Sequence, residues 1–131
     1  MVTLAKTVDI FWKAILMGVA TIMKMLTRKD EMVLLAILRL GEDASLVHLR
    51  QLLIQETDRP WSVGNVFVSL EKLERTGSIH SVLGQPTSKR GGKAVKCYRV
   101  TRQGLDELRQ AKAIQDGLWD GLYESVFNEQ K

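Results

Sequence analysis

The chain has little of the chemistry that disulfides and metal sites require. Its 131 residues include one cysteine, Cys97, and two histidines, His48 and His80. A single cysteine excludes an intramolecular disulfide and a cysteine-rich zinc site, and two histidines far apart in the sequence do not indicate a metal cluster. We therefore expect no metal and no cofactor. The scarcity of cysteine favours a reducing, cytoplasmic compartment.

The chain also lacks the short motifs of the common enzyme classes. It contains no glycine-rich phosphate-binding loop, no nucleophile elbow and no metalloprotease helix. No set of residues presents itself as a nucleophile with its base. We accordingly expect a binding protein and no enzymatic activity.

Acidic residues are missing from one segment of the chain. The 19 Lys and Arg residues exceed the 15 Asp and Glu residues by only four, a modest excess that does not itself identify a partner. From Gly84 to Arg102 there are bases but no acid, whereas acids predominate after Arg102. The bases of this segment are Lys89, Arg90, Lys93, Lys96, Arg99 and Arg102. A positive field confined to one segment suits a surface that binds a polyanion, because phosphate neutralisation dominates affinity.

Residues 1–26 are apolar, but they contain no uninterrupted run of membrane-spanning length. A transmembrane helix needs ~20 mostly uncharged residues, and Lys13 interrupts this stretch near its middle. A signal peptide is disfavoured because no small-residue cleavage pattern follows. We interpret the stretch as an amphipathic helix that packs on its own domain or on a partner subunit. Its narrow polar stripe consists of Lys6, Asp9, Lys13, Thr21 and Lys24. Translation from Met23 or Met25 is the open alternative, and it would make the segment a vestigial lead-in.

Apolar periodicity and capping residues predict four helices after residue 26. They cover roughly residues 27–40, 45–56, 62–75 and 101–122. Each begins at a short polar residue with N-cap chemistry: Thr27, Asp43 or Ser45, Ser62 and Thr101. Gly41 and Gly77 end the first and third helices. The first helix is apolar almost all round, which predicts burial in the core or in a subunit interface.

The third helix is followed by a basic hairpin. The stripe expected to be buried on this helix is Val63, Val66, Leu70 and Leu73, and the neighbouring polar stripe is Asn65, Ser69, Lys72 and Thr76. Residues 78–83 and 95–100 alternate as strands, with a Gly-rich basic loop over residues 84–94 between them. This order predicts a mainly α fold with a small β-hairpin wing, the winged helix-turn-helix, followed by a C-terminal helix. In that last helix, Gly117 and Gly121 either weaken its far end or mark a close approach of another helix.

Residues 62–79 resemble the recognition-helix segment of PadR-type transcriptional regulators. The matching positions are Ser62, Gly64, Leu70, Leu73, Glu74, Gly77 and Ile79. KCYRVTRQG at residues 96–104 is similar to the end of that family's wing, and TRKDEMVLLAILRLG at residues 27–41 is similar to its opening helix. The likeness covers about residues 27–122 and implies a DNA-binding dimer.

The sequence departs from the family pattern at three positions and in one segment. Phe67 and Cys97 stand where tyrosines are usual, and Val63 replaces the proline that opens the helix. The missing hydroxyls remove two groups that could bond phosphate, which affects affinity or target choice. Residues 1–26 have no counterpart in the family pattern.

A recognition helix in the major groove reads base edges with residues near its N-terminus. The predicted DNA contacts are Ser62, Asn65, Ser69, Lys72, Lys89, Arg90 and Lys93. Asn65 and Ser69 suit base edges, whereas Ser62 and Lys72 suit phosphates. The three wing residues suit phosphate or minor-groove contact. All could instead be solvated surface groups, and for Ser69 alone that alternative has equal weight.

These features together predict a sequence-specific regulator that binds double-stranded DNA, a repressor that reads a palindromic operator as a homodimer. We expect an N-terminal helical extension over residues 1–26, a winged-helix DNA-binding domain over residues 27–101 and a C-terminal dimerisation helix over residues 102–131. Trp119 either anchors the dimer or stacks on a small aromatic effector. We do not expect a membrane partner. The alternative is a winged-helix protein-interaction module that is membrane-associated through its first 26 residues.

Overall fold

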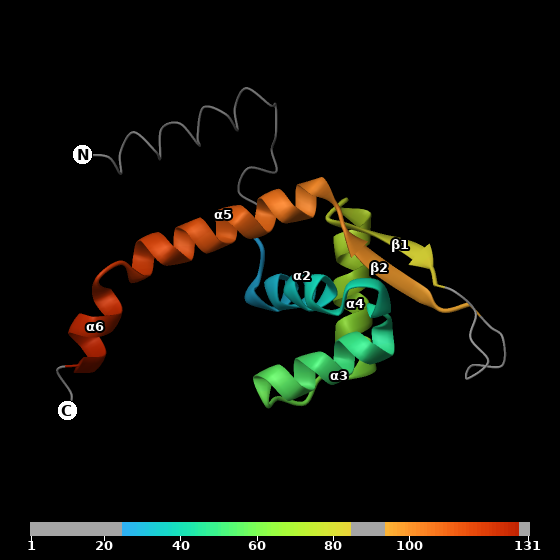
Figure 1. Ribbon diagram of the computed structural model, residues 1–131, viewed down its shortest axis with the longest axis horizontal. Helices are drawn as coiled ribbons and strands as arrows, with labels where there is room; N and C mark the ends of the chain where they lie inside the picture. Colours follow the sequence, from blue (N-terminus) through green and yellow to red (C-terminus); the bar gives the residue numbers. More distant parts are fainter. Residues whose placement is uncertain (1–24, 85–93, 129–131) are drawn as a thin grey trace, which may run out of the picture.

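The computed structural model describes residues 25–84 and 94–128. Three helices form a cluster, an antiparallel hairpin lies against it, and a long helix leads away to a short terminal one (Figure 1). The elements are α2 (Arg28–Leu40), a 3-10 turn (Gly41–Asp43), α3 (Leu46–Thr57), α4 (Val63–Arg75), β1 (Ile79–Leu83), β2 (Lys96–Val100), α5 (Arg102–Trp119) and α6 (Leu122–Phe127). The predicted fold class, mainly α with a small β-hairpin, is confirmed.

Short-range capping explains why four of the helices begin where they do. In each, a Ser or Thr hydroxyl accepts a hydrogen bond from a backbone N–H three residues later, which satisfies one otherwise unpaired donor. The capping residues are Thr27, Ser45, Ser62 and Thr101. Of the two candidates for α3, Ser45 is therefore the cap. The carbonyl of Asp43 instead lies 2.9 Å from Nδ1 of His48.

The core lies where α2, α3 and α4 cross and the hairpin covers them. Its largest fully buried apolar side chains are Leu34, Ile37, Leu49, Leu70, Leu73, Ile79, Val33 and Val66. The stripe predicted for α4 is confirmed at three positions and wrong at Val63, which is exposed in the first turn beyond the edge of the core. On α2, Leu35 and Leu38 are about half exposed, so that helix is buried along one side only.

The hairpin pairs β1 with β2 in antiparallel register from Ile79↔Val100 to Leu83↔Lys96. It is joined to the start of α3 by a bridge between Cys97 and Ser45, and by a hydrogen bond of 3.0 Å from the N–H of Tyr98 to the carbonyl of Ala44. Cys97 is buried in this junction. The base of the wing is therefore fixed to the helical cluster.

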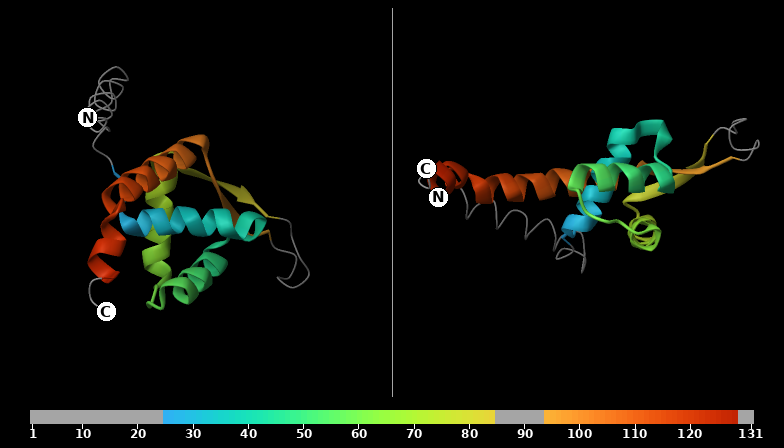
Figure 2. Two further views of the ribbon diagram at one scale, coloured as in Figure 1. Left: turned by 60° about the vertical axis from the view of Figure 1, so that its left-hand side comes forward. Right: turned by 90° about the horizontal axis from the view of Figure 1, so that it is seen from below.

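The C-terminal part differs from the single helix that the sequence predicts. α5 ends at Trp119, and α6 begins after Gly121, whose φ of 70° is a conformation that favours glycine. Both views of Figure 2 show α5 leaving the cluster and carrying α6 at its far end. Among the described residues, no helix is both long and apolar enough to cross a membrane.

Candidate nucleic-acid interface

The N-terminal half of α4 presents an open surface. Ser62, Gly64 and Asn65 are exposed in its first turn. One turn further on, Phe67 and Val68 are 45% and 60% exposed. A helix end with free backbone N–H groups and projecting side chains has the form that enters a major groove. The surface is more apolar than the sequence led us to expect.

A bonded turn between α3 and α4 holds this helix end in place. Arg50 Nε donates to the carbonyl of Trp61 at 2.7 Å, and the indole Nε1 of Trp61 donates to Thr57 Oγ1 at 2.9 Å. Thr57 in turn donates to the carbonyl of Leu53 at 2.6 Å. Asp58 takes a left-handed conformation, with φ 53°, to reverse the chain. The first turn of α4 is therefore presented by a rigid support.

Two basic residues that sequence reasoning missed lie beside this helix end. Lys29 Nζ is 6.0 Å from the ring centroid of Trp61, within the range of a cation–π contact. Lys29 and Arg59 line one open hollow together with Met32, Thr57, Pro60, Trp61 and Asn65. The sequence does indicate that Arg59 lies near this helix end, because Arg59 stands three residues before the cap of α4. It gives no such indication for Lys29, because only the fold brings the start of α2 to this place.

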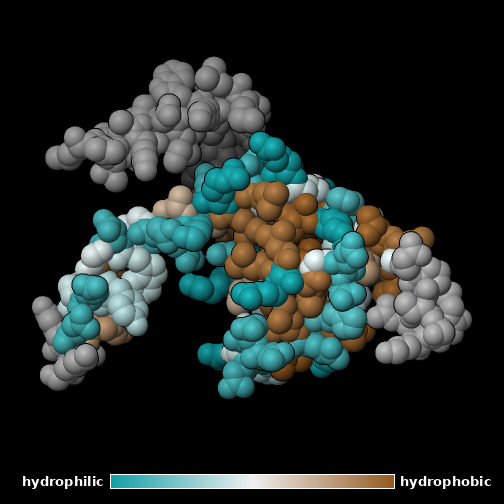
Figure 3. All heavy atoms as spheres, viewed as in Figure 1, coloured by the Kyte–Doolittle hydropathy of each residue, from teal (hydrophilic) through white to brown (hydrophobic). Residues whose placement is uncertain are grey.

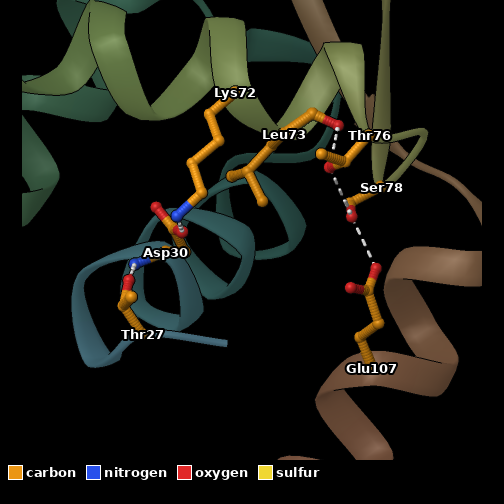
Figure 4. A network of polar contacts seen from close by, with 7 residues as sticks. All are labelled: Thr27, Asp30, Lys72, Leu73, Thr76, Ser78 and Glu107. Carbon is orange, nitrogen blue, oxygen red and sulfur yellow. Dashed lines mark hydrogen bonds and ion pairs between the residues drawn. The ribbon is translucent and has the colours of Figure 1, made fainter. Parts of the chain in front are cut away.

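Two of the predicted contact residues do not lie on the open face. Ser69 is 3% exposed and packs on the inner side of α4. Lys72 turns toward α2, where its Nζ lies 2.8 Å from Oδ2 of Asp30 (Figure 4). Ser69 is buried because positions 66, 69, 70 and 73 form the inner stripe of this helix. We correct both assignments: Ser69 belongs to the packed side, and Lys72 neutralises a nearly buried carboxylate.

The other end of α4 is held by the first turns of α5. Thr101 Oγ1 donates to the carbonyl of Gly77 at 2.6 Å, and Gln103 Nε2 donates to that of Thr76 at 2.8 Å. The hydroxyl of Ser78 donates to the Glu107 carboxylate, as Figure 4 shows. We call this set of contacts the α4–α5 clamp. It fixes the direction of α5 relative to that of α4.

Of the wing, the structure describes the two strands, β1 and β2. Lys89, Arg90 and Lys93 lie outside the described residues. On β2, Lys96 Nζ lies 3.8 Å from Glu74 Oε1, and Arg99 Nη1 donates to the carbonyl of Gly41 at 3.1 Å. These two bases therefore have protein partners at the base of the wing.

Among the described residues, Tyr98 on the inner side of β2 has a shifted pKa. Burial raises the pKa of its phenol above 10.0, and the charge of the neighbouring Lys96 opposes part of that rise. The phenol is therefore held in its neutral form. Within residues 25–84 and 94–128, no three His, Cys, Asp or Glu residues are gathered so as to hold a metal ion.

Apolar side chains gather at two further places on the surface. Figure 3 shows one over α2 at the middle of the molecule, where Leu35 and Leu38 are exposed. The other is an aromatic cluster on α5 and α6, in which Trp119 and Phe127 stack with ring centroids 6.5 Å apart. Tyr123 lies between them, 4.7 Å from Phe127 and 5.7 Å from Trp119.

The chain resembles several solved structures, although no family model and no curated protein matches its sequence. A PadR family transcriptional regulator from Eggerthella lenta superposes with a TM-score of 0.56 at 24% identity, covering 94% of this chain and 97% of that one. A transcriptional regulator from Clostridium thermocellum gives 0.54 at 21% identity, covering 77% and 87%. One from Thermoplasma acidophilum gives 0.53 at 18%, covering 73% and 93%. The fold of this chain is thus the winged helix-turn-helix of PadR-type transcriptional regulators.

Proposed function

We propose that the protein binds double-stranded DNA and regulates transcription. The observation that carries this proposal is the exposed, capped N-terminus of α4, held by a rigid turn with Lys29 and Arg59 beside it. The major groove of B-DNA admits one helix presented end-on, and basic groups at its sides neutralise the flanking phosphates. The regulators that share this fold support the same function.

The residues of α4 divide by chemistry into phosphate and base contacts. Ser62 and the free backbone N–H groups of the first turn suit a phosphate. The amide of Asn65 suits the N6 and N7 atoms of adenine, and the exposed side chains of Phe67 and Val68 suit the methyl group of thymine. At Gly64 an added Cβ would meet only Ser62 Oγ, 3.9 Å away. The fold does not require glycine at position 64. We propose that glycine lets the backbone approach DNA closely at this position.

The wing supplies the second contact area in this proposal. Lys89, Arg90 and Lys93 would meet phosphates or the adjacent minor groove, because the hairpin projects beyond the core next to α4. Arg59 and Lys29 would meet phosphates at the other side of α4. Ser69 and Lys72 are left out, because one is buried and the other neutralises Asp30.

We further propose a twofold dimer that represses transcription from a palindromic operator. A single winged helix reads one half-site, so a dimer doubles the recognised sequence. The exposed apolar side chains of α2 and the aromatic cluster of α5 and α6 are the surfaces available for the partner subunit. In this arrangement Trp119 is an interface anchor, because stacked aromatic rings typically dominate the energetics of an interface. The same rings would stack on a small aromatic effector.

Binding to the protein's own promoter region tests the proposal. The logarithm of the affinity, measured by fluorescence anisotropy, should fall linearly with the logarithm of salt concentration. In the Lys89→Ala/Arg90→Ala variant the slope should become less steep by ~1 for each phosphate that is no longer neutralised. The matched control is Arg109→Ala/Lys112→Ala, which removes the same charge from the exposed side of α5. Equal effects of the two variants, or no binding at low salt, would refute the proposal.

Repression and the dimer need separate measurements. Deleting the gene should raise transcript levels from the bound promoter, and a fall would identify an activator. Analytical ultracentrifugation of the free protein should give twice the monomer mass. Trp119→Ala should shift that mass toward the monomer, whereas an unchanged mass would remove Trp119 from the interface.

A further inference from the structure

The side of α4 that faces away from the core is apolar in its first two turns. Val63, Phe67 and Val68 are 53%, 45% and 60% exposed on this side, and Gly64 is exposed beside them. Residues four apart lie one above the other on a helix, so Val63 and Phe67 form one row, and Gly64 and Val68 form the next. We call these four residues the α4 strip.

The polar side chain that follows the α4 strip is an acceptor of hydrogen bonds. Glu71 stands one turn after Phe67 on the same side of the helix and is exposed. Among the described residues, Glu71 takes part in no ion pair. Arg75, the basic residue on this side, lies in the last turn of α4. Neither the α4 strip nor the carboxylate of Glu71 can therefore donate a hydrogen bond.

Basic residues lie around the α4 strip, which favours a polyanion as its partner. Lys29 and Arg59 line the hollow that Asn65 borders at the edge of the strip, and Arg75 is exposed at the far end of the helix. In the proposed complex with DNA, these charges meet phosphates. The strip between them then lies against the edges of the bases, where sequence is read.

The four bases differ in what they present to such a surface in the major groove. Guanine presents two acceptors, cytosine an amino donor, adenine one acceptor and one donor, and thymine an acceptor and its C5-methyl group. An apolar strip leaves the acceptors of guanine without partners, which costs free energy, whereas contact with a thymine methyl group is favourable. A carboxylate accepts from the N4 amino group of cytosine. The bases that suit this side of α4 are therefore both pyrimidines.

Given the proposed binding to DNA, on which this step rests, we infer that α4 recognises the pyrimidines of its half-site. Val63, Phe67 and Val68 contact the C5-methyl groups of thymines. The carboxylate of Glu71 accepts a hydrogen bond from the N4 amino group of a cytosine, which lies beyond the thymines toward the C-terminus of α4. Guanine is excluded at these positions because neither group can bond its acceptors.

Duplexes selected by the full-length protein from a randomised library test the methyl contacts. Each thymine of the selected half-site is replaced in turn by uracil, which removes the methyl group and keeps every hydrogen-bonding group. At two or more positions the affinity, measured by fluorescence anisotropy, should fall about fourfold, the factor that burial of one methyl group carries. Unchanged affinity for every uracil duplex, or a half-site rich in guanine on both strands, would overturn the inference. No binding to any duplex would instead refute the proposed function.

Variants of the α4 strip show whether it is the surface that senses the methyl groups. In Phe67→Ala/Val68→Ala the ratio of the affinities for the thymine and uracil duplexes should fall to about one. Val47→Ala is the matched control and should keep the ratio of the unmodified protein, because Val47 is 61% exposed, as Val68 is 60%, but lies on α3. Partial unfolding lowers both affinities alike and leaves their ratio unchanged. Equal ratios in the two variants would overturn the inference.

Glu71→Gln tests the cytosine contact through a change of preferred base. Glutamine has nearly the same shape, and its amide pairs with N6 and N7 of adenine. Selection with this variant should replace one cytosine position of the half-site by adenine and leave the thymine positions unchanged. Glu124→Gln removes the same charge from the exposed surface of α6 and should leave every selected base unchanged. If Glu71→Gln strengthens binding to all duplexes alike and keeps the same preferred bases, Glu71 acts through its charge alone, and its assigned contact is wrong.

Discussion

The ammonium of Lys72 on α4 lies 2.8 Å from the carboxylate of Asp30 on α2, across 42 residues of sequence. Asp30 is the acid that follows the Thr27 cap, and its side chain is only 6% exposed. The pair therefore joins α4 to α2, which packs across it. Lys72, a basic residue on α4, thus has a role in the protein's own stability.

Replacing Lys72 should affect stability more than DNA binding. Lys72→Ala leaves a nearly buried carboxylate without its partner, and the free energy of unfolding should fall by ~1–3 kcal/mol. Urea denaturation measures the change, with Lys112→Ala as the control. Lys112 belongs to an exposed pair, for which the expected loss is at most ~0.5 kcal/mol. A Lys72→Ala variant with unchanged stability and a flatter salt slope would return Lys72 to the DNA contact set.

Replacing either of two glycines of α5 by alanine should change the free energy of unfolding, but in opposite directions. At Gly104 an added Cβ would lie 2.3 Å from the carbonyl oxygen of Ser78 and 2.7 Å from Cγ1 of Val100. Gly104→Ala must push the α4–α5 clamp apart, so we expect a loss of ~1–3 kcal/mol in the free energy of unfolding. Gly117 has open space around it, and Gly117→Ala should gain up to ~1 kcal/mol through helix propensity. Thermal unfolding of both variants checks the pair, and a stable Gly104→Ala protein would contradict the close contact.

Gly64→Ala should weaken DNA binding without lowering the stability of the fold. The added methyl group has room, and alanine favours the helix, so stability should stay the same or rise by up to ~1 kcal/mol. If the backbone of the first turn approaches DNA closely, the same methyl group should weaken binding at least tenfold, ~1.4 kcal/mol. Circular dichroism and anisotropy on one preparation measure both quantities. Undiminished DNA affinity would show that this turn stays clear of the groove.

The buried phenol of Tyr98 should make stability fall in alkali. Its pKa in the folded state is raised above 10.0 by burial, so the unfolded chain loses this proton at a lower pH than the folded chain does. The stability that this raised pKa contributes is fully present below pH 10 and is lost as the pH rises from 10 through the pKa of the folded state. Tyr98→Phe removes the titrating group, and the free energy of unfolding should then decline less over this range. Parallel pH profiles of the two proteins would contradict the shift.

The helix starts could be predicted because the interactions that set them are local. Thr27, Ser45, Ser62 and Thr101 each bond to an N–H three residues away, and such bonds are visible as a sequence pattern. The hairpin was likewise predictable from strand alternation and from Gly77, whose φ is 86°. The division at residues 26 and 101 stays a prediction, as do the DNA contacts of the wing.

The misassignments on α4 have two different causes. Val66, Ser69, Leu70 and Leu73 follow the i, i+3, i+4, i+7 rule of a buried stripe, so the burial of Ser69 was readable once Val63 was set aside. Nothing in the sequence near Lys72 reveals Asp30, because their pairing depends on how α2 crosses α4. Local chemistry thus predicts where an element begins, whereas the direction of a long side chain depends on packing partners far along the chain.

The α4–α5 clamp couples the direction of α5 to that of α4. α5 has 18 residues and is therefore ~27 Å long. A tilt of ~10° at its clamped end displaces the far end by on the order of 5 Å, because displacement grows with length along a rigid helix. In the proposed dimer, a molecule that repositions Trp119 or α6 should therefore change the direction of α4 and the spacing of the two α4 helices. If the proposed dimer forms, the distance between half-sites that it accepts should depend on the hydrogen bonds of Thr101, Gln103 and Ser78, which lie away from the proposed DNA contacts.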